Sequence, residues 1–189
     1  MLHLKWKIYC KHNSKIKLVV GAGRTKFPGW FSTEVYFLDV TKEEDFQKLF
    51  SERKINNILA EHVLEHLTSQ QLELMTVNFY KYSSDDVNIR IAVPDGYHND
   101  EGYINSVKPG GTGGGAWDHK HLFNYKSLSL FFENAGFKAY PLEYWDENKT
   151  FNTTYKNDDM GYINRSFIND KRNSDGKPHY TSLIIDFKK

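Results

Sequence analysis

The sequence contains a single cysteine, Cys10, among its 189 residues. One thiol excludes an intramolecular disulfide framework, so we expect a protein of a reducing, cytoplasmic setting. No apolar run approaches the ~18 residues of a membrane-spanning helix. The basic amino terminus also lacks the continuous apolar stretch of a signal peptide. These absences predict a protein without a membrane span.

An excess of charge of one sign is also missing. The 25 Lys and Arg residues balance 24 Asp and Glu residues, which leaves a formal net charge of +1. The basic residues form no stripe that could follow a phosphate backbone, so we do not expect nucleic acid as the main partner. The length predicts one domain, residues 1–189, with enough chain to bury a sizeable core.

Apolar periodicity predicts alternating strands and helices. Short apolar runs indicate strands at residues 17–21, 58–60, 88–94, 137–144 and 181–187. Two amphipathic helices are predicted to begin at capping boxes that pair Thr41 with Glu44 and Thr68 with Gln71. A third begins near Asn124 and ends at Gly136, a favoured residue just past a helix end. This alternation predicts a mainly parallel, helix-covered sheet.

Two segments lie outside the predicted α/β core of residues 15–145 and 181–187. Residues 146–178 are rich in Asn, Asp and Lys, and we interpret them as an ordered surface insertion. In residues 2–9 apolar side chains alternate, which predicts an added strand or a partner-facing segment.

The stretch ILAEHVLEHL, residues 58–67, admits two chemical interpretations. His62, Glu65 and His66 form H-x-x-E-H, an inverted zinc-peptidase motif that requires both imidazoles on one helix face. Alternatively, residues 58–60 end a parallel strand, and the polar residues emerge at the sheet edge where open α/β folds bind ligands. A strand directly before His62 leaves little helix for the peptidase motif and favours the second interpretation.

The first predicted strand runs into Gly21-Ala22-Gly23, where paired glycines allow close backbone approach to a ligand. A dinucleotide site would need a third glycine at a helix start and an acid ~20 residues later. Glu34 and Asp39 come too early for that spacing. The glycine-rich stretch 108–115 lacks the G-K-[ST] ending of a phosphate-binding loop, and we interpret it as a mobile cover over a cleft.

Taken in order, the motifs resemble one enzyme family. LVVGAG, PGW followed by STE, LDV, ILAEHVLEHL, IRIAVPDGYH, DHKHLFNY and ENAGF are similar to small class I S-adenosylmethionine (SAM)-dependent methyltransferases. The resemblance covers about residues 17–144 plus the last strand, and is to short bacterial enzymes often encoded beside surface-polysaccharide genes. It implies a Rossmann-like, mostly parallel seven-stranded sheet with an antiparallel last strand and helices on both faces. It also implies SAM as cofactor and S-adenosylhomocysteine (SAH) as product.

The resemblance also implies which residues contact the cofactor. Gly21, Ala22 and Gly23 would lie against its methionine part, and Glu34 would accept hydrogen bonds from the ribose hydroxyls. Asp39 and Val40, at the end of a third short strand, would lie near the adenine. Glu61 and His62 would face the sulfonium and the substrate.

The later polar residues include three candidates for the proton acceptor. His119 is the favoured base, because a neutral imidazole can take a hydroxyl proton near neutral pH. Asp95 is a second candidate, either as base or by orienting an imidazole, and His98 is a third. The alternative role for His119 and His121 is to hydrogen-bond a loop to the sheet.

The acceptor is expected to be a small molecule or a glycan, with O-methylation of a sugar as the favoured reaction. Trp117, Tyr125, Tyr144 and Trp145 are placed to stack on a sugar ring or to belong to the core. We expect no bound metal, although Asp118, His119 and His121 leave a metal-assisted variant open. A binding protein without catalysis is the other remaining alternative, and the oligomeric state is not determined by the sequence.

Overall fold

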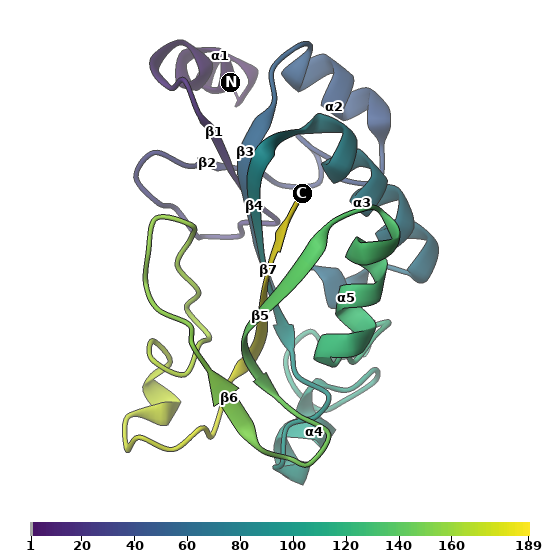
Figure 1. Cartoon of the computed structure of the whole chain (residues 1–189), viewed down its shortest axis with the longest axis vertical. Coiled ribbons are helices and arrows are strands. Elements are labelled where there is room, and N and C mark those ends of the chain that lie inside the picture. Colours follow the sequence, from purple (N-terminus) through teal and green to yellow (C-terminus); the bar gives the residue numbers. More distant parts are fainter. Residues whose placement is uncertain (1) are drawn as a thin grey trace.

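The computed structural model describes residues 2–189, so Met1 of the expected domain lies outside it. Its centre is one mixed sheet whose seven strands are β1 (Ile16–Val20), β2 (Phe31–Ser32), β3 (Ile55–Glu61), β4 (Ser83–Pro94), β5 (Lys138–Trp145), β6 (Phe151–Thr153) and β7 (Ser182–Lys188). Their order across the sheet is β2-β1-β3-β4-β7-β5-β6 (Figure 1). All five predicted strands are present, with boundaries shifted by a few residues.

The strand directions agree with the expected topology. β2, β1, β3 and β4 are parallel neighbours, whereas β7 lies antiparallel between β4 and β5. The predicted short strand ending at Asp39 and Val40 is wrong, because these residues lie in the irregular segment between β2 and α2. The Asp39 carboxylate accepts hydrogen bonds from the amide and hydroxyl of Thr41, and such local bonding competes with strand pairing. The seventh strand is instead β6, in the segment expected to be an insertion.

Five α-helices accompany the sheet in the described residues: α1 (Leu2–His12), α2 (Glu43–Phe50), α3 (Ser69–Tyr82), α4 (Glu101–Val107) and α5 (Tyr125–Asn134). The capping box of Thr68 and Gln71 is present at α3, and Asn124 caps α5. The capping box predicted for Thr41 is wrong, because α2 begins after Lys42 and has no side-chain cap. The Thr41 hydroxyl donates to Asp39 instead.

The amino-terminal segment is helix α1, not the predicted added strand. Trp6 is buried, and its indole N–H donates to the carbonyl of Leu49 at 3.0 Å. Leu2 and Tyr9 pack against the same core, while Leu4 and Ile8 point outward. Residues 2, 6 and 9 follow the helical spacing of i, i+4 and i+7, and these residues face the core. The alternation of apolar residues in this segment therefore does not indicate a strand.

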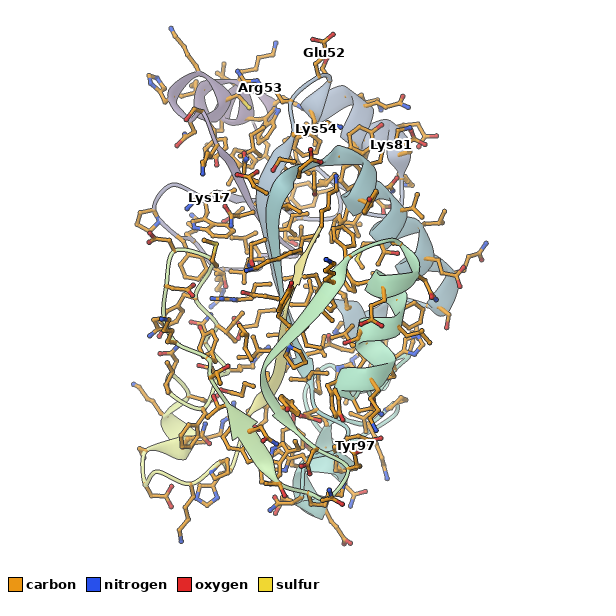
Figure 2. All side chains as sticks on the ribbon, in the orientation of Figure 1. Lys17, Glu52, Arg53, Lys54, Lys81 and Tyr97 are labelled. Carbon is orange, nitrogen blue, oxygen red and sulfur yellow. The ribbon has the colours of Figure 1, made fainter. Side chains whose placement is uncertain are left out.

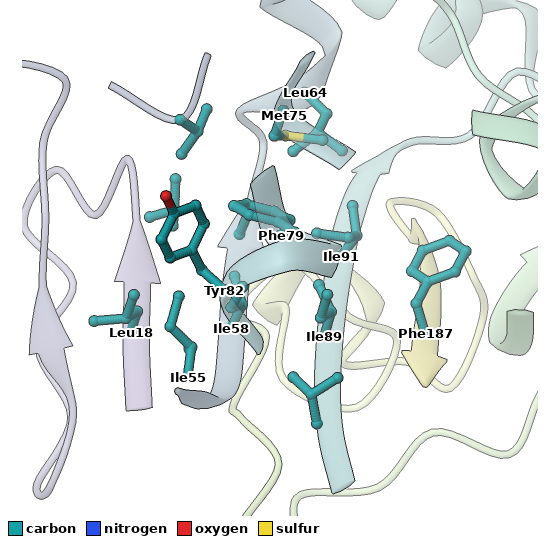
Figure 3. Close-up of a cluster of buried hydrophobic side chains, with 14 of the residues drawn as sticks. Leu18, Ile55, Ile58, Leu64, Met75, Phe79, Tyr82, Ile89, Ile91 and Phe187 are labelled. Carbon is teal, nitrogen blue, oxygen red and sulfur yellow. The ribbon is translucent and has the colours of Figure 1, made fainter. Parts of the chain in front are cut away.

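The main core lies between one face of the sheet and helices α1, α2, α3 and α5. Figure 3 shows its centre, where aliphatic side chains from β1, β3 and β4 meet Met75, Phe79 and Tyr82 of α3. Each fully buried side chain of this kind contributes about 1.5–3 kcal/mol relative to an exposed one. This core fixes the carboxyl ends of β1, β3 and β4 relative to one another.

The opposite face of the sheet differs from the expectation of helices on both faces. Its apolar side chains from β1, β3, β4 and β7 are covered by Phe27, Trp30, Tyr155 and Ile163, which belong to irregular segments. The polar segment 146–178 therefore covers part of this face, whereas helices cover the other face of the sheet. The carboxyl end of β4, marked by Tyr97, lies at the opposite end of the molecule from Lys54 and Lys81 (Figure 2).

Arg90 of β4 anchors this cover from inside the sheet. Its guanidinium is buried and donates to Asp186 of β7 at 2.7 and 2.8 Å, to Asp158 at 2.8 Å and to the Gly161 carbonyl at 2.7 Å. The buried charge is thus paired on both sides.

None of the helices in residues 2–189 has the length and apolar character needed to cross a membrane.

Candidate functional site

Two cavities lie at the carboxyl ends of the parallel strands. The first has a volume of about 620 Å³ and is lined by residues 19–27 together with Leu59, Glu61, His62, Asn164 and Arg165. The second has a volume of about 450 Å³ and is lined by residues that include His62, Glu65, His66, His119, Arg165, Arg172 and Tyr180. His62 and Arg165 belong to both walls, so the cavities are neighbours.

The glycine loop after β1 forms the floor of the first cavity. Gly21 and Gly23 have φ angles of 57° and 55°, values that favour glycine. A Cβ atom on Gly21 would lie only 2.6 Å from Cγ2 of Val63, whereas one on Gly23 would meet nothing within 4 Å. The amide of Gly23 donates to the carboxylate of Glu34. The structure therefore places Gly21, Ala22 and Gly23 together, with Glu34 beside them.

Glu61, the last residue of β3, holds a wall of the first cavity in place. Its carboxylate accepts hydrogen bonds from the Asn164 amide at 3.1 Å, the Asn164 side chain at 2.9 Å and the Arg165 amide at 2.8 Å. Asn164 and Arg165 were not predicted from the sequence, because neither lies in a motif or a regular element. The only available signal was the polar insertion that contains them.

His62 lies at the junction of the two cavities with a φ angle of 55°, which is uncommon for a residue with a side chain. Its Nε2 is 3.0 Å from the Ser182 hydroxyl, and its Nδ1 is 3.3 Å from the Glu65 carboxylate. Both ring nitrogens therefore have polar neighbours within the protein. These contacts suit a role of His62 in shaping the cavities better than a role as proton acceptor.

Glu65, His66 and His119 form a polar cluster in the second cavity. Nδ1 of His119 lies 2.6 Å from the Val107 carbonyl, which can only accept a hydrogen bond. Nδ1 is therefore the donor, and Nε2 makes no hydrogen bond within residues 2–189. Nδ1 of His66 similarly faces the Asp118 carboxylate at 3.3 Å. The two imidazole rings pack edge to face at 4.8 Å.

The Glu65 side chain is fully buried within this cluster. Its contact with His62 lacks hydrogen-bond geometry, so neither carboxylate oxygen has a hydrogen-bond partner among the described residues. Burial alone would raise the pKa of Glu65. His62 and His66 outweigh that effect, and the pKa lies below its ordinary value. The nearby imidazoles therefore favour the ionised form of this buried carboxylate.

The H-x-x-E-H stretch does not adopt the peptidase arrangement. His62 follows β3 with a left-handed backbone, and residues 64–66 form only a short 3₁₀ turn, η1 (Leu64–His66). The two histidines therefore do not lie on successive turns of one helix, as the zinc-peptidase motif requires. Instead, Glu65 and His66 join His119 from a distant loop.

Asp39 and Val40 are not brought to either cavity. Asp39 is half-buried, Val40 is buried, and both lie before α2. Burial tends to raise the pKa of Asp39, but hydrogen bonds from Thr41 and the nearby Lys42 lower it overall. Its carboxylate is committed to this local turn.

Asp95 and His98 also lie away from both cavities. The Asp95 carboxylate is fully buried and accepts from the amides of Tyr97 at 2.9 Å and Trp145 at 2.7 Å, so it ties β4 to β5. Burial raises the pKa of Asp95 to about 6 and lowers that of His98 to about 4. His98 stacks on Tyr103 with ring centroids 3.9 Å apart. These contacts indicate structural roles, contrary to the catalytic roles expected.

The four aromatic residues that were expected to stack on a sugar or to belong to the core lie in different environments. Trp145 is buried and donates to the Thr181 hydroxyl, so it belongs to the core. Tyr125 packs on Tyr144 with ring centroids 4.9 Å apart. Trp117 is 79% exposed in the short 3₁₀ turn η2 (Ala116–Asp118), beside the second cavity. The aromatic residue that lines this cavity is Tyr180, which sequence analysis missed.

No protein-family model matches the sequence, and no curated protein matches it. A solved SAM-dependent methyltransferase from Archaeoglobus fulgidus is similar in structure, with a TM-score of 0.51 at 15% identity over 99% of this chain and 93% of that one. This chain has the Rossmann-like fold of class I methyltransferases. A SAM-dependent methyltransferase from Anabaena variabilis ATCC 29413 gives a TM-score of 0.46 at 12% identity, over 97% of this chain and 70% of that one.

Proposed function

We propose that this protein is a SAM-dependent methyltransferase that methylates a hydroxyl group of a small acceptor such as a sugar. The observation that carries the proposal is the pair of cavities that meet at His62 and Arg165, beside the glycine loop of a methyltransferase-like fold. Their volumes lie within the ~300–1,000 Å³ range of small-molecule sites. In this proposal the first cavity holds the cofactor and the second holds the acceptor.

The volume and the charged lining of the first cavity support its assignment to SAM. Gly23 leaves space beside the backbone, and Arg24, Lys26 and Arg165 supply positive charges for a carboxylate such as that of the methionine part. Glu34 lies beside Gly23 and is proposed to contact the ribose. When bound, SAM supplies a methyl group that is already activated, so the protein has to align the acceptor and accept its proton.

Titration calorimetry of the purified chain with SAM and SAH tests this proposal. We expect micromolar binding of one ligand molecule per chain, weakened about tenfold or more in Glu34→Gln. The exposed Glu52→Gln variant, at the opposite end of the sheet, serves as the matched control. If the wild-type protein binds neither compound, the methyltransferase proposal is wrong.

His119 is proposed as the proton acceptor, because its free Nε2 lines the second cavity. A positioned base typically contributes 10²–10⁴-fold to a rate. With an acceptor found by screening sugars and nucleotide sugars for SAH release, we expect His119→Gln to lower kcat within that range. Its affinity for SAM should remain unchanged. Wild-type turnover in this variant would refute the assignment, and SAM binding without SAH release from any acceptor would indicate a binding protein.

A further inference from the structure

We propose that Glu65, His66 and His119 form a binding site for a divalent transition-metal ion, with an open coordination position toward the second cavity. One potential ligand atom from each of these residues lies within 4.8 Å of the others. A metal–ligand distance of ~2.1 Å requires only a small side-chain movement to draw these atoms around one ion. The three residues come from η1 and from the loop after η2, which meet at this point of the fold.

The buried carboxylate is the observation that points to a ligand. Glu65 is fully buried, yet neither of its oxygens has a hydrogen-bond partner among residues 2–189. A buried carboxylate whose oxygens accept no hydrogen bond is costly, even with Nδ1 of His62 3.3 Å away, and coordination of a metal is one of the ways in which proteins compensate this cost. The loop geometry keeps the cluster together, because the Glu65 carbonyl accepts hydrogen bonds from the amides of Lys120 and His121.

Both imidazoles are held as metal-binding histidines usually are. A ligating histidine typically donates its second ring N–H to a carboxylate or a carbonyl, which fixes the ring and its tautomer. His66 directs Nδ1 to the Asp118 carboxylate at 3.3 Å, and His119 directs Nδ1 to the Val107 carbonyl at 2.6 Å. Each ring therefore keeps Nε2 for a metal ion.

The donor set selects the kind of metal. Two imidazoles and one carboxylate suit zinc and related transition metals, whereas magnesium prefers oxygen ligands. The remaining position faces the cavity lined by Arg172 and Tyr180, where an oxygen atom of a bound acceptor could complete the coordination. With the ion bound, Nε2 of His119 would be a ligand, and this role would replace the role of His119 as the base proposed above. The acceptor hydroxyl would then bind the ion and lose its proton to water, because a metal ion lowers the pKa of a bound oxygen acid.

Calorimetric titration of the full chain with zinc chloride, after removal of metals with a chelator, tests the site directly. We expect one zinc ion per chain with micromolar or tighter affinity, and no comparable binding of magnesium. His66→Gln, His119→Gln and Glu65→Gln should each abolish this binding or weaken it at least tenfold. Asp118→Asn should weaken it by about 10–100-fold, the usual effect of removing a residue that orients a ligand.

His121→Gln is the matched control, because this neighbouring histidine stacks on Phe123 and lies outside the cluster. It should bind zinc like the wild-type protein, and circular dichroism verifies that every variant is folded. Absence of stoichiometric zinc binding in the wild type, or equal binding in the Glu65→Gln and His119→Gln variants, would overturn the proposal. Metal binding is measured without SAM, so the metal site and the SAM site can each fail while the other stands, whereas zinc binding through His119 would overturn its assignment as the base.

Discussion

At the scale of single residues, Gly21 and Gly23 provide a matched pair for testing the glycine loop. Both have left-handed backbones, but only Gly21 faces another side chain, that of Val63. A left-handed conformation costs a residue with a Cβ atom about 1–2 kcal/mol. We expect Gly23→Ala to lose this amount in urea unfolding, and Gly21→Ala to lose more because Val63 has to move. Equal losses would show that the contact with Val63 is unimportant.

Part of the candidate site was predictable from the sequence at this scale. Gly21, Glu61, His62 and His119 could be singled out because each follows a strand or lies in a short motif. Asp95 looked equally suitable, but its carboxylate is used by the backbone of β5, which is distant in sequence. A polar residue at a strand end can serve a ligand or a neighbouring strand, and local pattern does not distinguish these two uses.

At the scale of elements, α1 illustrates how periodicity misleads in a short segment. Trp6 is buried against the core, whereas Leu4 on the same helix is 64% exposed. Replacing a buried Trp by Ala typically costs about 3–5 kcal/mol, and an exposed substitution changes stability by less than about 0.5 kcal/mol. We therefore expect Trp6→Ala, but not Leu4→Ala, to lower the free energy of unfolding measured with urea. Similar effects of both variants would contradict the helical register of α1.

The longer elements were predictable because their patterns extend over several turns or a fully buried strand. α3 shows both a capping box and an apolar stripe, and β4 contains an apolar run that ends at Pro94. By contrast, β6 has only three residues and depends on its pairing with β5. The cover of the second sheet face likewise depends on Arg90, whose partners Asp158 and Asp186 are remote in the sequence.

At the scale of the whole molecule, the buried acid Glu143 makes stability depend on pH. Burial raises its pKa to about 8, above the ordinary value of 4.5, and its carboxylate accepts a hydrogen bond from the Phe167 amide of the cover. The folded state therefore holds this proton more tightly than the unfolded chain. Stability from Glu143 is full below pH 4.5 and is lost as the pH rises through about 8.

We expect the free energy of unfolding to fall between about pH 7 and 8, by at most about 1.4 kcal/mol per pH unit for one proton, and to level off at higher pH once the folded state has also lost the proton. Asp95 and His98 have pKa values of about 6 and 4, so both have largely completed their titration below this range. Glu143→Gln should flatten the decrease, whereas the exposed Glu52→Gln should not. A slope that is unchanged in Glu143→Gln would assign the effect to another group.

The wall that the two cavities share has a thermodynamic consequence. His62 and Arg165 face both cavities, so a ligand that displaces either side chain in one cavity alters the shape of the other. Two ligands coupled in this way obey reciprocity: if the acceptor changes the affinity for SAH by some factor, SAH changes the affinity for the acceptor by the same factor. Titrations of each ligand in the presence of the other would give this coupling free energy, and its sign would show whether the product SAH retains or expels the second ligand.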